Sequence, residues 1–321
     1  MKTFVALLLS ALMGVLVAGV PAQSDEGPPV WAYPVNPPDF KLPPDDGTPR
    51  RVPGSNVAFT LTQLRDRFLA PDWRPGDHPP MPAVVSRGRK PDVFACGFCH
   101  RADGPGGPEN ANLAGFPAAY IVQQMREFKS GARTTSVLLR NVDLMISLAK
   151  AATDAEVDEA AAYFSALKPR AVIRVVETDT VPKTYVTGWH LAAMPGGEKE
   201  PIGRRIVEVP EDLERFVSRD ARSRFIAYVP LCSLLKGQAL VATGGGGKTI
   251  QCGICHGPDL KGLGPIPGIA GRSPSYLVRQ LYDFKYGARA GTASALMKPT
   301  VEKLTLEDMV LLAAYVASLT P

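Results

Sequence analysis

The sequence predicts a mainly α-helical protein in which two copies of one helical domain are joined by a small β-rich insert. Three observations support this prediction. A Cys-x-x-Cys-His motif occurs twice, at residues 96–100 and 252–256, which lie 156 residues apart. Amphipathic segments follow each motif at matching positions. The stretch between the two copies is instead rich in β-branched and aromatic residues, which favour strands.

The segment after each motif repeats residue by residue, which indicates an internal duplication. Residues 113–133 align with residues 269–289 at the same offset of 156 and share 10 of 21 positions. Ile121, Met125 and Phe128 recur at helical spacing and a glycine follows, so we expect an amphipathic helix that ends at glycine. The identical pairs include Tyr120 with Tyr276, Phe128 with Phe284, Gly131 with Gly287, and Arg133 with Arg289.

A second helix is expected at the end of each copy. Thr153 and Glu156 form a capping-box pattern, in which each residue can satisfy the backbone N–H of the other, and an apolar helix face follows. Thr305 and Asp308 stand at the corresponding point of the second copy. Each copy is therefore predicted to be closed by a capped, amphipathic helix.

Residues 170–235 fit neither copy, and we expect them to form a β-rich insert. Its predicted strands are residues 172–178, 184–191, 206–209 and 225–229. Upstream, residues 21–53 contain ten prolines, a composition that predicts an extended arm, with a short helix near residues 59–69. We therefore divide the chain into a signal peptide (1–22), a proline-rich arm (23–80), a first helical domain (81–169), the insert (170–235) and a second helical domain (236–321).

The repeated motif has the spacing that suits covalent attachment of haem, because two thiols can add across the porphyrin vinyl groups while the adjacent histidine binds the iron. The sequence therefore predicts two covalently bound haem c groups. The candidate thioether residues are Cys96, Cys99, Cys252 and Cys255, and the candidate iron ligands are His100 and His256. A structural zinc site and a redox-active dithiol are the alternatives. The histidine after each pair and the placement of the pairs in separate copies favour haem.

Each iron would keep one further axial position, which a methionine thioether can fill. Met145 and Met297 correspond to each other in the repeat, each 18 residues before the tyrosine of the terminal helix, and are the predicted distal ligands. Lys298 and Pro299 suggest a rigid loop that presents the Met297 sulfur. Other residues remain as alternatives for the first haem: His78, His190 and Met81. Met125 and Met309 align with Leu281 and Val157, so we assign them to packing.

The chain begins with Lys2, an apolar run from Phe4 to Val20 and small residues up to Ala22, a pattern typical of a cleaved secretory signal. An uncleaved membrane anchor is the alternative. The formal net charge of +5 is too small to indicate nucleic-acid binding. Residues 91–168 carry −2 and residues 235–321 carry +4, so the second domain is the better candidate for docking an acidic partner.

The two motifs, Met145, Met297 and the closing helices resemble those of class I diheme cytochromes c of the c4-like kind. That resemblance implies two cytochrome c-like helical haem domains in an exported, periplasmic protein that transfers single electrons between redox proteins, including a membrane-bound oxidase or dehydrogenase. We expect a carrier rather than an enzyme. The rivals are a diheme peroxidase-like or thiosulfate-oxidising enzyme and a cytochrome subunit of a dehydrogenase. The insert and the arm depart from the simple c4 plan, so the usual packing between the haems is not assumed.

Overall fold

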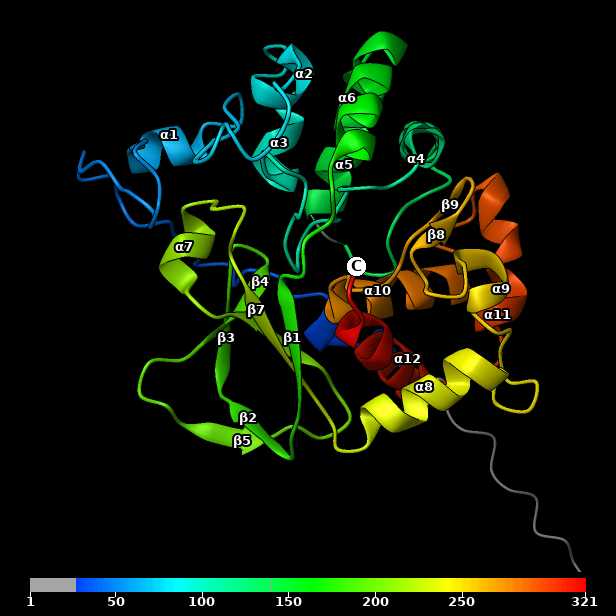
Figure 1. The fold of residues 1–321 in the computed structure, drawn as a ribbon. Coiled ribbons are helices and arrows are strands. Elements are labelled where there is room, and N and C mark those ends of the chain that lie inside the picture. Colours follow the sequence, from blue (N-terminus) through cyan, green and yellow to red (C-terminus); the bar gives the residue numbers. More distant parts are fainter. Residues whose placement is uncertain (1–26, 139) are drawn as a thin grey trace, which may run out of the picture.

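The computed structural model describes residues 27–138 and 140–321, and the expected signal peptide lies outside this part of the chain. The described residues form two helical regions with a β-rich region beside them, as the sequence predicts (Figure 1). Within these ranges, no helix is long and apolar enough to cross a membrane.

Two short helices precede the first motif. The helix α1 (Leu61–Arg65) belongs to the arm, and α2 (Ala83–Ser86) lies at the start of the first helical region. The first motif forms α3 (Cys96–His100), and three longer helices follow: α4 (Ala118–Ser130), α5 (Arg140–Ala151) and α6 (Asp154–Ala166). Gly131 ends α4 with φ 79°, a left-handed conformation that glycine adopts without a Cβ penalty. The glycine-terminated helix is therefore confirmed in the first copy, whereas the helix of the second copy ends at Lys285, with Tyr286 between its end and Gly287.

The second helical region repeats this plan and adds a helix before the motif. Its elements are α8 (Ser233–Thr243), α9 (Gly253–His256), β8 (Gly262–Leu263), β9 (Ile266–Pro267), α10 (Pro274–Lys285), the 3-10 helix η2 (Thr292–Leu296), α11 (Lys298–Val301) and α12 (Leu306–Ser318). The sequence did not predict α8, which packs along α12. A Cβ on Gly237 would collide with the carbonyl of Leu311, so glycine permits this close approach.

Both predicted capping boxes are present. The Thr153 hydroxyl accepts from the Glu156 backbone N–H at 3.2 Å, and the Glu156 carboxylate accepts from the Thr153 N–H at 2.8 Å. Thr305 and Asp308 form the same pair of hydrogen bonds at 3.2 and 2.8 Å. These caps fix the first residues of α6 and α12.

The insert contains a three-stranded sheet with the order β1-β7-β6, made of β1 (Ile173–Glu177), β7 (Phe225–Val229) and β6 (Val207–Pro210). Strands β1 and β7 are parallel, and β6 runs antiparallel to β7. The single strand expected at residues 184–191 is wrong: the chain forms a hairpin of β3 (Thr184–Thr187) and β4 (His190–Ala193). Gly188 and Trp189 both have positive φ, the conformation of a tight hairpin turn.

Three further elements of the insert were not predicted from the sequence. A second small ladder pairs β2 (Thr180–Pro182) with β5 (Lys199–Pro201). A short helix, α7 (Leu213–Val217), begins at Asp212, whose carboxylate accepts from the Arg215 N–H. Figure 1 shows α7 on the side of the sheet that lies toward α1 and α3.

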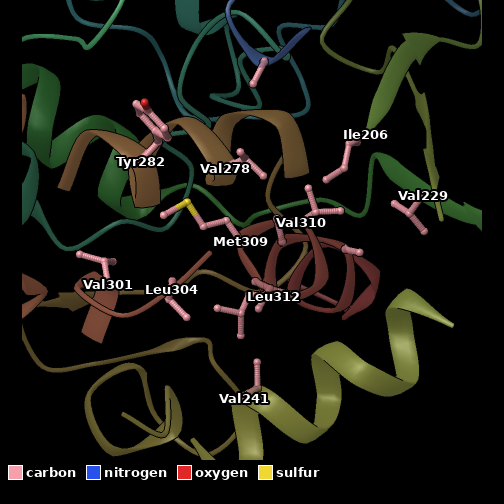
Figure 2. Packing of buried hydrophobic residues seen from close by; sticks show 14 of the residues in the cluster. Ile206, Val229, Val241, Val278, Tyr282, Val301, Leu304, Met309, Val310 and Leu312 are labelled. Carbon is pink, nitrogen blue, oxygen red and sulfur yellow. The ribbon is translucent and has the colours of Figure 1, made fainter. Parts of the chain in front are cut away.

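The arm and the insert share the core of the second helical region (Figure 2). Ile206 and Val229 of the insert lie close to Val310 of α12, and all three are at most 2% exposed. Tyr33 follows the 3-10 helix η1 (Val30–Ala32) of the arm and is 2% exposed in the same cluster. The arm and the insert are therefore packed parts of the molecule.

Candidate haem sites

The first motif forms the single-turn helix α3, and its histidine is held by the loop that follows. His100 is buried, and its Nδ1 lies 2.8 Å from the carbonyl oxygen of Ala111. Burial lowers the pKa of His100, which favours the neutral imidazole. An imidazole that donates from Nδ1 has its Nε2 lone pair available for a metal, and the hydrogen bond fixes the ring orientation.

The second motif repeats this arrangement 156 residues later. His256 Nδ1 lies 2.8 Å from the carbonyl oxygen of Pro267, which corresponds to Ala111 in the repeat. Burial also lowers the pKa of His256. The sequence identified both histidines but not their carbonyl partners, because any residue can supply a backbone carbonyl.

The thiols of the motifs are unlike those of a dithiol redox site. Burial, and secondarily the neighbouring Cys99, raises the pKa of Cys96 to about 12, and burial raises the pKa of Cys252 to about 11. Reactive thiols have a pKa below the usual value, because the thiolate is the nucleophile. The raised pKa values of Cys96 and Cys252 do not favour disulfide exchange at these two thiols, whereas thioether formation consumes them.

A cavity with an accessible volume of about 150 Å³ opens beside α3. Its wall brings together Cys96, Cys99, His100 and, from α5, Met145. Much of the remaining wall is apolar; α4, α5 and α6 contribute part of it, and charged residues such as Glu109 and Arg279 also line it. The alternative ligands His78, His190 and Met81 do not line it. The assignment of Met145 as distal ligand stays a prediction, and the cavity is consistent with it.

The region of the second motif is more open. A hollow beside α9 is lined by Gly253 and Ile254 of the motif and by Tyr315 of α12, and its described lining includes neither His256 nor Met297. Met297 is half-buried between η2 and α11 and packs against the core of this region. The loop expected after it is wrong, because Pro299 lies in the first turn of α11. The role of Met297 stays a prediction.

The two repeats meet in a short antiparallel bridge centred on Arg133 and Arg289. The Thr134 N–H donates to the Ala288 carbonyl at 2.7 Å, and the Ala290 N–H donates to the Ala132 carbonyl at 2.8 Å. Thr134 corresponds to Ala290 in the repeat, and Ala132 corresponds to Ala288. The two hydrogen bonds are therefore equivalent, and the bridge is symmetric with respect to the repeat.

The side chains around this bridge repeat the same symmetry. Each arginine donates to a glutamine of its own repeat at 2.7–3.0 Å, and each also crosses to a glutamine and a tyrosine of the other repeat at 2.7–3.4 Å. The six residues are Tyr120, Gln124, Arg133, Tyr276, Gln280 and Arg289. In the sequence, these six residues are recognisable only as polar positions that are identical in the two copies. That identity does not indicate that they contact one another.

Two buried guanidinium groups lie side by side, and the buried Glu127 carboxylate is among the charges that act on Arg133. Arg133 and Arg289 are 8% and 6% exposed, the six hydrogen bonds above all end on neutral oxygens, and Arg289 Nε is buried without a partner. Burial, and then the charge of Arg133, lowers the pKa of Arg289. Uncompensated buried charges are strongly destabilising. Because Arg133 and Tyr276 also line the first cavity, the propionates of a haem are suitable anions for this site.

A duplicated helical domain with two Cys-x-x-Cys-His helices and two identically held histidines defines a c-type cytochrome. No model of a known protein family matches the sequence. The thiosulfate dehydrogenase electron acceptor of Thiomonas intermedia is 27% identical over 218 residues, which cover 67% of this chain and 74% of that protein. Cytochrome c-554(548) of Halomonas halodenitrificans is 40% identical over 78 residues, covering 24% of this chain and 94% of the relative.

Cytochrome c4 of Pseudomonas aeruginosa is 25% identical over 232 residues, or 70% of this chain and 83% of the relative. The chain belongs to the c4-like diheme cytochromes c, a family that extends to the thiosulfate dehydrogenase electron acceptors. It is thus an electron-transfer cytochrome that carries covalent haem c and acts with redox protein partners.

Proposed function

We propose that this protein is an exported, periplasmic carrier with two haem c groups, which passes single electrons between redox proteins. The observation that carries the proposal is the repeated geometry of the motifs, in which each histidine Nδ1 lies 2.8 Å from a carbonyl at the same offset. One such arrangement suits one haem, and its repetition supports a second.

Each motif would hold its haem through its two cysteines and its histidine, with Met145 and Met297 as the distal ligands. Bound haem c supplies a one-electron couple between ferric and ferrous iron, with a potential set by its ligands and by burial. The chain orients the imidazoles through Ala111 and Pro267 and excludes water with the apolar walls of α4, α5 and α6. The arginine pair between the repeats compensates propionate charge.

A carrier needs closed coordination at both irons, whereas a peroxidase-like or thiosulfate-oxidising enzyme needs an open or displaceable position. We infer that both positions are closed by methionine, because Met145 and Met297 correspond in the repeat and Met145 faces the first cavity. One relative is named a thiosulfate dehydrogenase electron acceptor, so a thiosulfate-oxidising enzyme is a suitable candidate for the electron donor of this chain.

Absorption spectra of the oxidised, haem-loaded protein test this proposal. Met145→Ala and Met297→Ala are each expected to remove part of the methionine-to-ferric-iron band, and the double variant all of it. The reduced wild-type protein is expected not to bind carbon monoxide, and each variant is expected to bind it at one haem. Rapid, stoichiometric binding of carbon monoxide by the wild type would instead favour the enzyme, and an unchanged variant spectrum would exclude that methionine.

A further inference from the structure

The two haem motifs differ sharply in what covers them, and this difference indicates where a partner binds. We propose that a redox protein with an acidic docking face binds over α9 and the β8–β9 hairpin of the second region, and that the corresponding face of the first motif is closed to such partners. The inference rests on the proposed function, since it takes both motifs to carry haem.

Equivalent motif residues are buried in the first copy and exposed in the second. Phe98 is 8% exposed, whereas Ile254, 156 residues later, is 63% exposed. A Cβ on Gly97 would lie 2.8 Å from the Ala70 Cβ and 3.0 Å from the Val85 carbonyl oxygen. The nearest atom to a Cβ on Gly253 would be Pro258 Cα at 3.7 Å. The first motif is therefore in tight contact with other parts of the chain, and the second is not.

The insert adds a further layer of cover over the first motif. Arg219, which follows α7, lies with its guanidinium carbon 3.6 Å from the centre of the Phe98 ring. Its Nη1 donates to the Phe98 carbonyl and its Nε to the Leu64 carbonyl, both at 2.8 Å. The Trp73 indole donates to the Ser218 carbonyl at 2.8 Å, so the arm and the insert are joined at this cover.

The residue after each motif histidine differs in the same way. Arg101 is 3% exposed, with its guanidinium 5.0 Å above the Phe216 ring of α7 and 3.7 Å from the Glu109 carboxylate. It holds φ at 67°, a conformation that costs energy for any residue with a Cβ. Gly257 takes this position in the second copy with φ 83°. Only the first copy has a side chain here that binds it to the insert.

The second motif is surrounded by the side chains of a docking face. Ile250, Ile254 and Leu263 are 39%, 63% and 58% exposed, and β8 packs beside α9. Lys261 and Asp259 are both exposed next to this apolar group and line the hollow at α9, and Lys261 Nζ also donates to the Pro321 oxygen at 3.3 Å. Apolar contacts surrounded by charged residues are the usual composition of protein interfaces, and the charges set the choice of partner.

The net charge of the whole second region, rather than of the motif face alone, favours an acidic partner. Residues 235–321 carry +4, whereas residues 91–168 carry −2. Long-range attraction to a positive region raises the rate of encounter with acidic proteins and is screened by salt. An acidic protein is thus drawn to the region whose motif is also accessible.

The test uses the full-length, haem-loaded protein and oxidised flavodoxin, a small acidic electron-transfer protein, as the probe. Amide chemical shifts recorded during a titration at low ionic strength are expected to change at residues 250–263 and to stay constant at residues 96–101. Lys261→Glu is expected to raise the Kd about ten-fold, or about 1.4 kcal/mol. Lys129→Glu, an exposed lysine of α4 with the same charge change, is the control and is expected to have little effect.

Shift changes centred on the first motif, equal effects of the two variants, or no binding of flavodoxin would each overturn the inference. Mass spectrometry of the same sample separates this result from a failure of the proposed function. A protein that lacks two haems contradicts the proposed function, whereas a loaded protein that binds elsewhere or not at all contradicts only the docking site.

Discussion

Arg133 and Arg289 lie opposite each other in the backbone bridge between the two repeats, and each guanidinium reaches a glutamine that the other also contacts. The pair joins the two repeats through buried positive charge, at a contact that no sequence pattern predicts. If haem propionates compensate this pair, as proposed above, the two arginines influence the reduction potentials of the haems.

Replacing Arg133 by methionine removes one of these charges beside the first cavity. The oxidised haem carries one more positive charge than the reduced haem, so loss of a nearby cation stabilises the oxidised form and lowers the potential. A unit charge at roughly 15 Å with an effective dielectric constant of about 20 gives about 1 kcal/mol. That corresponds to about 40 mV for a one-electron couple, since a tenfold change is about 59 mV. Redox titration measures this shift.

Arg126→Met is the matched control, because Arg126 lies on α4, shortly before Arg133 in the chain, and is exposed. Water screens its charge, so the expected shift is much smaller. Equal shifts in the two variants would show that the bridge has no special relation to the haems.

The tight contact at Gly97 predicts a difference between two equivalent substitutions. Gly97→Ala places a methyl group 2.8 Å from the Ala70 Cβ, and such overpacking costs about 1–3 kcal/mol of unfolding free energy. Gly253→Ala enters open space and removes a helical glycine, so it is expected to be neutral or to stabilise by up to about 1 kcal/mol. Denaturant unfolding followed by circular dichroism checks both. A Gly97→Ala protein as stable as the wild type would mean that the cover over the first motif is loose.

The arm contributes a buried aromatic side chain to the second core. Tyr33 is 2% exposed, and its hydroxyl donates to Asp283 Oδ1 of α10 at 2.9 Å. Tyr33→Ala is expected to cost about 3–5 kcal/mol, the usual range for removing a buried aromatic ring. Val35→Ala, at a position that is 52% exposed, is expected to change stability by less than about 0.5 kcal/mol. Equal effects of the two substitutions on thermal unfolding would show that the arm is a linker that does not stabilise the core.

The ion pair at the start of α6 gives an acid-sensitive contribution to stability. Arg89 Nε donates to Glu156 at 2.8 Å, and this hydrogen bond, aided by Thr153, lowers the pKa of Glu156 to about 2. Because the folded pKa lies below the unfolded value of about 4.3, the contribution is present above that value and is lost as the pH falls toward 2. Arg89 is half exposed, so solvent limits the contribution to about 1 kcal/mol.

Glu156→Gln is therefore expected to lower the unfolding free energy at pH 7 and to flatten its decrease between about pH 4 and pH 2. Glu159→Gln, at an exposed position of the same helix, serves as the control and is expected to leave the profile unchanged. An identical pH profile for Glu156→Gln and the wild type would contradict the role of this pair.

Local patterns carried the correct predictions, because helix periodicity, capping boxes and a terminating glycine act within a few residues. Thr153 with Glu156 and Gly131 are examples, and the strand at residues 225–229 was also predicted with its observed bounds. Duplication added the match between the two histidines, since a residue in one copy identifies its partner in the other.

Long-range packing accounts for what the sequence did not predict. The contact of Arg219 with Phe98 joins positions 121 residues apart, and no local pattern indicates it. The hairpin at Gly188 and Trp189 was missed because residues 184–191 are rich in β-branched and aromatic residues, and Trp189 is an unusual residue for a position with positive φ. The arginine bridge forms because the two copies pack against each other in a symmetric contact. Identity between their sequences does not show that the copies are in contact.

The mass of the mature protein, purified from a host that attaches haem to exported cytochromes, tests the central claim most directly. Two covalent haems predict a polypeptide heavier than its amino acids by two haem masses, with Cys96→Ala/Cys99→Ala and Cys252→Ala/Cys255→Ala each losing one. A mature chain with the mass of its amino acids alone would contradict the account.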